Sequence, residues 1–139
     1  MIRPHQVERL LAVLKSHPLG VIATVSAENL PEAALMQFAE TDKLEIIFGT
    51  HPSRKLQNIE NSGRVAWVIG WDHVTLQYEG HVTKLVGPEL DTHLALYLKK
   101  LPEAAAHMHP TTTYYKVTPT WIRYTDVAVN PPEVFEVAP

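Results

Sequence analysis

The sequence predicts a mainly β fold, a six-stranded antiparallel barrel with flanking helices, in a single domain spanning residues 1–139. Apolar and β-branched runs recur between short turns, which is typical of adjacent antiparallel strands. The pattern does not alternate strands with helices as a doubly wound parallel sheet would. A small closed barrel is the most economical arrangement, because closure removes exposed strand edges.

The first half of the chain is expected to hold a helix followed by three strands. Apolar residues at helical spacing, with Pro4 near the start, predict a helix within residues 1–19. Turn residues at 27–29 and 41–43 separate the runs that follow. The predicted strands span residues 20–26, 30–38 and 44–50.

The second half begins with a short helix over residues 52–61, which Ser62 and Gly63 are expected to end. In the longest strand Gly80 marks a bulge or bend. A second amphipathic helix starts at Gly87 and Pro88. The tail, residues 127–139, is proline-rich and is expected to lie over the surface. The remaining predicted strands span residues 64–71, 74–86 and 113–124.

Composition excludes several classes of function. The chain has no cysteine, which rules out disulfides, thiolate metal sites and a cysteine nucleophile. Its formal net charge of -3 argues against a nucleic-acid surface. No apolar run reaches the roughly 18–20 residues of a membrane helix. The first residues lack the layout of a secretory signal, so we expect a cytoplasmic protein that binds neither membrane nor nucleic acid.

The segment from Gly49 to Lys55 carries the clearest chemical signal. A strand ends at Thr50, and a helix begins at once with Ser53, Arg54 and Lys55 in its first turn. Unpaired N–H groups and the helix dipole attract anions there, whereas basic side chains oppose the dipole. A phosphate held between the helix dipole and the cations would explain why two basic residues follow one another here, with Arg54 binding two phosphate oxygens. A solvated pair of charges on a surface helix is the alternative.

The run Thr50-x-x-Ser53-Arg54-Lys55-x-x-x-Ile59-Glu60-Asn61-x-x-Arg64-Val65 resembles the FMN signature of the pyridoxamine 5'-phosphate oxidase family. The order of elements, over roughly residues 6–126, resembles that family's split barrel. The resemblance implies homodimers with two FMN sites at the subunit interface. It implies that Thr50, Arg54 and Lys55 hold the phosphate, with Gly49 and Ser53 close by. It also implies that the backbone of Leu35, Met36 and Gln37 follows the isoalloxazine ring.

The later strands include a departure from the family and several aromatic residues. Thr75 takes the position of a glutamine that faces the flavin in the family, with Gln77 two residues later on the same face. Trp121 either meets a partner's flavin or fills the barrel end. Four aromatic residues suit either a dimer interface or the barrel core: Trp67, Trp71, Tyr78 and Trp121.

Two further departures separate the chain from the true oxidases of this family. Residues 32–37 contain no basic residue where those enzymes reach their substrate, and the tail lacks their Arg-Leu-His motif. The pattern is closer to the general-stress-protein branch. The resemblance implies an FMN-dependent oxidoreductase acting on an unidentified small molecule, with no catalytic residue assigned. The alternatives are a non-catalytic flavin-binding stress protein, or a split barrel that handles a deazaflavin or haem.

The segment His107-Met108-His109 suggests a metal or haem ligand. No carboxylate neighbours the two histidines, and a metal site usually has three or four protein ligands. We therefore predict no metal site.

Overall fold

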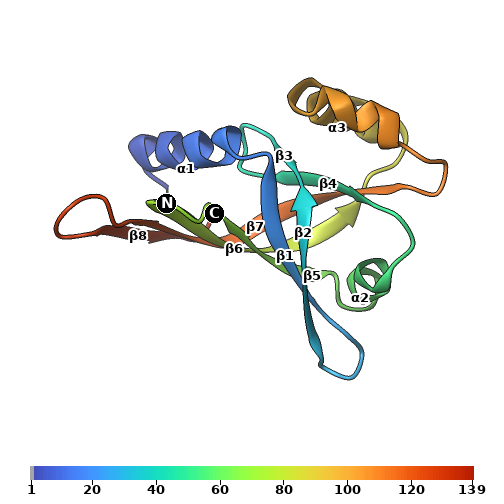
Figure 1. The fold of residues 1–139 in the computed structure, drawn as a ribbon, viewed down its shortest axis with the longest axis horizontal. Helices are drawn as coiled ribbons and strands as arrows, with labels where there is room; N and C mark the ends of the chain where they lie inside the picture. Colours follow the sequence, from blue (N-terminus) through green and yellow to red (C-terminus); the bar gives the residue numbers. More distant parts are fainter. Residues whose placement is uncertain (1) are drawn as a thin grey trace.

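One antiparallel sheet of eight strands organises the computed structural model, which describes residues 2–139 (Figure 1). Met1, the first residue of the expected 1–19 segment, lies outside the described residues. The strands are β1 (Leu19–Val25), β2 (Pro31–Gln37), β3 (Ala39–Glu40), β4 (Ile46–Thr50), β5 (Arg64–Ile69), β6 (Val74–Lys84), β7 (Thr113–Asp126) and β8 (Glu133–Val137). The helices are α1 (Pro4–Ser16), α2 (Arg54–Ser62), α3 (Gly87–Lys100) and the short 3-10 helix η1 (Pro102–His107). The predicted fold class, a mainly antiparallel split barrel with flanking helices, is confirmed.

The sheet differs from the expected barrel in being open. Its hydrogen-bonded order is β2-β1-β5-β6-β7-β4-β3, with β8 added on β7. Phe38, fully buried, is the single residue between β2 and β3. The chain therefore passes directly from one end of the strand order to the other. The two end strands, β2 and β3, are joined there by the chain itself and not by a ladder of backbone hydrogen bonds.

The predicted count of six strands is too low, because two further strands are present. The segment predicted as one strand over residues 30–38 is followed by the separate two-residue strand β3. The tail does not simply lie over the surface, because Glu133–Val137 forms β8 and pairs with the second half of β7. Its Val137 is buried, and Phe135 stacks on Tyr124 at 4.7 Å between ring centroids. This burial explains why a short, proline-flanked segment joins the sheet.

The local stop and bend signals are confirmed. Gly63 ends α2 in the left-handed conformation, at φ 69°. The register of β6 and β7 shifts between Glu79 and Gly80, so the expected bulge is present. A Cβ at Gly80 would lie 2.5 Å from the carbonyl oxygen of Thr118, which explains why a glycine occupies this position.

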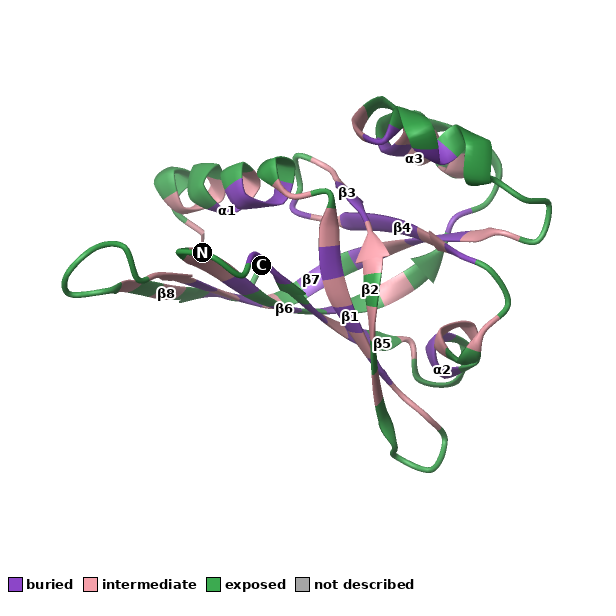
Figure 2. Cartoon of the chain, in the orientation of Figure 1, coloured by how far each residue is buried: buried purple, intermediate pink, exposed green. Residues whose placement is uncertain are grey.

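The core lies on the inner face of the curled sheet. Trp67 packs edge-on against Phe38 and Phe48, with ring centroids 5.8 and 5.5 Å away. Trp67 and Tyr78 are each only 1% exposed. They therefore belong to the barrel core, which was the alternative to a dimer interface. Trp71 is exposed instead. Figure 2 shows the buried residues of α1 and α2 on the sides turned toward the sheet.

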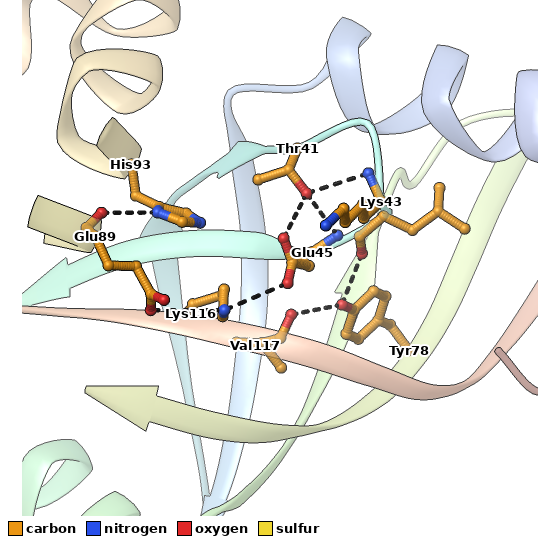
Figure 3. Close-up of polar contacts among 9 residues, drawn as sticks. Thr41, Lys43, Glu45, Tyr78, Glu89, His93, Lys116 and Val117 are labelled. Atoms are coloured by element: carbon orange, nitrogen blue, oxygen red, sulfur yellow. Dashed lines mark hydrogen bonds and ion pairs between the residues drawn. The ribbon is translucent and has the colours of Figure 1, made fainter. Parts of the chain in front are cut away.

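Polar contacts tie the turn between β3 and β4 to the rest of the sheet (Figure 3). The buried Tyr78 hydroxyl donates to the carbonyl oxygens of Leu44, at 2.8 Å, and Val117, at 3.1 Å. Lys116 of β7 lies 3.6 Å from a carboxylate oxygen of Glu45 and 3.6 Å from one of Glu89. The second of these ion pairs joins α3 to the sheet.

A second anchor of α3 is Lys100, which is largely buried. Its ammonium donates to Glu40 at 2.5 Å and to the carbonyl oxygen of Leu14 at 2.8 Å, and it lies 4.0 Å from the Phe38 ring centroid. Burial lowers the pKa of Lys100, and the hydrogen bond and charge of Glu40 oppose that shift. Through these contacts α3 and η1 are held against one end of the sheet, where they form part of the candidate site.

Candidate functional site

The hydroxyl groups of two residues, Thr50 and Ser53, lie together where β4 ends and α2 begins. Thr50, the buried last residue of β4, donates through Oγ1 to the carbonyl oxygen of His51 at 3.1 Å. The same Oγ1 lies 3.4 Å from Oγ of Ser53. Ser53 caps α2 by accepting from the backbone N–H of Leu56 at 3.4 Å. The cap leaves other first-turn N–H groups free for an anion.

Two cations follow the cap directly, as the sequence predicted. Arg54 is 84% exposed at its side chain, and Lys55 is partly buried. The structure therefore places Thr50, Ser53, Arg54 and Lys55 at one helix start. The helix start therefore combines a serine cap, first-turn N–H groups and two basic side chains, which are the groups that bind anions.

Two polar residues of this region were missed by the sequence reasoning. Glu32 of β2 lies 3.5 Å from Nη1 of Arg54. Asn58, only 6% exposed, donates through Nδ2 to Thr24 at 3.0 Å and to Glu32 at 3.3 Å. Arg54 and Asn58 are four residues apart, and this spacing was the available signal that both lie on one face of α2.

A cleft of about 280 Å³ lies beside the end of β4, the strand that leads into this helix start. Its lining includes Leu35, Met36 and Gln37 of β2, together with Gly49 and His51 on either side of Thr50. The structure thus brings four more of the predicted residues to one cavity. Gly49 and His51 flank Thr50 in the chain, so the cleft lies beside the end of β4 that leads into α2, whereas Thr50, Ser53, Arg54 and Lys55 themselves are not part of its lining.

Most of the remaining lining comes from α3, η1 and β7, which sequence reasoning did not connect with the site. Tyr97 and Tyr114 pack edge to face, with ring centroids 5.8 Å apart, and His107 joins them. A Cβ at Gly49 would lie 2.6 Å from the Tyr114 ring, so only glycine allows this approach. Burial raises the pKa of Tyr97 to about 12 and also raises the pKa of Tyr114. Both phenols stay protonated at neutral pH and can donate hydrogen bonds.

The other predicted residues lie on the outer face of the sheet. Gln77 is exposed, whereas its neighbours Leu76 and Tyr78 are buried, and Thr75 lies on the Gln77 side. Trp121, opposite Glu79 in the register, donates through its indole N–H to Glu136 at 2.7 Å. Within the described chain these three residues are not part of the cleft lining.

The histidines and the helices add two observations. His51 and His109 lie edge to face, with ring centroids 6.1 Å apart. Among residues 2–139, no group of three or more histidine or acidic side chains is arranged to hold a metal ion. Over the same residues, no helix combines the length and the apolar character needed to cross a membrane.

A curled antiparallel sheet with flanking helices defines a split-barrel protein, and the cationic start of α2 is its candidate anion site. The chain belongs to the pyridoxamine 5'-phosphate oxidase family, which it matches over residues 7–126. It is 35% identical over 77 residues to a pyridoxine/pyridoxamine 5'-phosphate oxidase of Ruegeria sp. (strain TM1040). That alignment covers 53% of this chain and 38% of the relative, so the chain matches little more than a third of the curated protein.

Solved structures share the fold at low identity. A pyridoxamine 5'-phosphate oxidase-related, FMN binding protein from Nostoc punctiforme is 14% identical, with a TM-score of 0.72 over 99% of this chain and 97% of that one. A haem binding protein from Mycobacterium smegmatis is 16% identical, with a TM-score of 0.84 over 99% of this chain and 60% of that one.

The residues of the site fit the FMN that the family resemblance implies. The capped, cationic helix start suits a phosphate monoester. The apolar and aromatic cleft beside β2 suits a planar ring system. Its volume of about 280 Å³ lies just below the roughly 300–1,000 Å³ of most ligand pockets. A second chain or a displaced side chain would have to complete the ring's enclosure.

Proposed function

We propose that the chain binds FMN, with the phosphate at the start of α2 and the ring in the cleft beside β2, and acts as an FMN-dependent oxidoreductase on a small molecule. The observation that supports this proposal is the start of α2, with the Ser53 cap followed by Arg54 and Lys55, close in the chain to the end of β4, where Gly49 and residues 35–37 line a cleft. The proposal includes a cytoplasmic location, which fractionation of cells expressing the tagged chain would test.

Each part of the site has a defined task in this proposal. Arg54 and Lys55 would neutralise the phosphate, and the first-turn N–H groups of α2 would donate to it. The backbone of β2 would orient the ring, and the protonated Tyr97 and Tyr114 would donate hydrogen bonds within the cleft. Bound flavin supplies hydride or electron transfer, while the protein supplies binding, orientation and electrostatics.

A homodimer forms part of the proposal, because an exposed face of the sheet suits a second copy. Leu35, Val21, Val68 and Gln77 lie in one line across β2, β1, β5 and β6. Leu35 is 59% and Val68 42% exposed, which makes this line a candidate apolar contact. In such a dimer the partner's Gln77 and Trp121 would approach the flavin. Light scattering should give twice the mass of one chain, and Val68→Lys should shift the measured mass toward that of one chain. A wild-type protein with the mass of one chain contradicts the proposed homodimer.

The test of FMN binding is titration of the purified protein with FMN, followed by optical spectra. Arg54→Ala with Lys55→Ala should weaken FMN affinity at least about tenfold, because charge-assisted contacts contribute about 1.5–3 kcal/mol each. The matched control, Lys43→Ala with Lys99→Ala, removes two exposed lysines elsewhere and should leave affinity unchanged. Equal affinities in both double variants would show that the phosphate lies elsewhere.

Catalysis and simple binding are separated by the electron donor. Bleaching of the bound flavin by a reduced nicotinamide, with reoxidation by an added acceptor, supports an oxidoreductase. A flavin that stays oxidised under these conditions supports the non-catalytic binding protein instead.

Haem is the second candidate ligand, and one observation favours it. His51 and His107 both belong to the cleft lining, and neutral imidazole is a common axial ligand of haem iron. Titration with haem should then give a shifted Soret band that His107→Ala abolishes. A protein that takes up FMN and leaves the haem spectrum unchanged contradicts this candidate.

A further inference from the structure

Glu32 is an acidic residue fixed beside the cationic helix start. Its side chain is 26% exposed, and one carboxylate oxygen lies 3.5 Å from Nη1 of Arg54. The other oxygen accepts from Nδ2 of Asn58 at 3.3 Å. The carboxylate therefore contacts two successive turns of α2 on the side that faces β2.

The Asn58 contact keeps Glu32 in place. Asn58 is buried, and its amide is also bound to Thr24 of β1 at 3.0 Å. A buried amide that lost its acceptor would incur a desolvation penalty, so the carboxylate is restrained near α2. Arg54, in contrast, is 84% exposed and can leave its partner at low cost.

These contacts set Glu32 in competition with any phosphate at this site. The carboxylate occupies the guanidinium that would grip phosphate oxygens, and its negative charge repels a dianion arriving at the same place. The uncharged part of a flavin does not meet this opposition. The effect of Glu32 should therefore appear only for ligands that carry the phosphate.

We propose that Glu32 is a resident counter-anion of the phosphate site, which holds Arg54 in the ligand-free chain and lowers the affinity for phosphate monoesters such as FMN. This inference rests on the proposed phosphate site at the start of α2. Its consequence is a cofactor that exchanges more readily than Arg54 and Lys55 alone would allow.

The experiment compares FMN with riboflavin, which lacks the phosphate, by equilibrium titration of the full chain. Glu32→Gln keeps an acceptor for Asn58 and removes the charge; it should tighten FMN binding by about two- to fivefold. Riboflavin binding should not change. Glu28→Gln, at an exposed turn next to β2, removes the same charge and should leave both affinities as in wild type.

Arg54→Ala provides the test of mechanism. If Glu32 acts through Arg54, the gain from Glu32→Gln must shrink in the Arg54→Ala background, because there is then no arginine to release. Glu32→Asp, which keeps the charge but shortens the side chain by one methylene, should give a smaller gain. This variant serves where Glu32→Gln lowers the yield of folded protein.

The outcomes separate the two proposals. A wild-type protein that binds riboflavin as tightly as FMN overturns the phosphate site itself. A wild type that prefers FMN, with a preference that Glu32→Gln leaves unchanged or reduces, overturns only the role of Glu32. If Glu32→Gln raises the affinity for FMN equally with and without Arg54, the proposed role of Glu32 is also overturned.

Discussion

Tyr78→Phe removes one buried hydroxyl and leaves the aromatic ring. The hydroxyl donates to Leu44, in the turn between β3 and β4, and to Val117 of β7 (Figure 3). Burial raises the pKa of Tyr78, so the hydroxyl stays protonated and keeps donating. The variant thus cuts the polar link that joins β6 to this turn without opening a cavity larger than one oxygen atom.

The expected loss of stability follows from the two contacts. The hydroxyl has one proton, which the two carbonyl oxygens share; leaving a buried acceptor without its donor costs about 1–3 kcal/mol, so the variant should lose about that much. At about 2.1 cal/mol/K per residue, the 139 residues have an unfolding entropy near 0.3 kcal/mol/K. Division gives a fall in Tm of about 3–10 °C.

Thermal and urea unfolding followed by tryptophan fluorescence would measure this loss. Tyr124→Phe is the matched control: the Tyr124 ring stacks on Phe135, and its hydroxyl makes no hydrogen bond with the described residues. It should lose less than about 0.5 kcal/mol. Equal losses in the two variants, or a Tyr78→Phe protein as stable as wild type, would refute the reasoning.

Three further outcomes are expected. Lys100→Met should lower the free energy of unfolding by about 2–4 kcal/mol in urea melts, because it leaves the carboxylate of Glu40 buried without its partner; adding Glu40→Gln should restore part of the loss. The pKa of Tyr97 rises from 10.0 to about 12 on folding, so its contribution to stability is complete below pH 10.0 and is lost as the pH rises to about 12; Tyr97→Phe should flatten the fall in Tm over this range, and an unchanged slope would contradict it. Gly49→Ala should displace the Tyr114 ring, at a cost of about 1–3 kcal/mol, and weaken FMN binding measured by titration.

The parts of the fold that sequence reasoning predicted are those with local signals. Gly63 ends α2 and Gly80 marks the bulge because both positions demand a particular backbone. The open barrel has no such signal, because it depends on Phe38 joining strands that pair with different partners. Strand β8 was missed because its stability comes from packing against β7, a contact that its own prolines give no sign of.

The candidate site likewise has one part that local sequence signals predict and one part that they do not. Residues 50–55 are contiguous, so a capped helix start with two cations could be read directly. The opposite side of the cleft, with Tyr97 and His107, depends on how α3 and η1 dock, and that docking uses the distant pairs of Lys100 and Lys116. Glu32 was missed as a site residue, because its contacts with α2 depend on how β2 packs against that helix.

Strand β7 also determines when the protein can fold during synthesis. It is the partner of β6 along one edge and of β4 and then β8 along the other, so it alone joins the two halves of the strand order. Until residues 113–126 leave the ribosome, β4 and β6 have no common neighbour, and their apolar faces stay uncovered. Long-range pairing of this kind makes folding slow and exposes the nascent chain to aggregation. We expect ribosome-bound chains that end before Thr113 to be protease-sensitive and to bind chaperones, whereas chains extended past Val137 outside the exit tunnel become resistant.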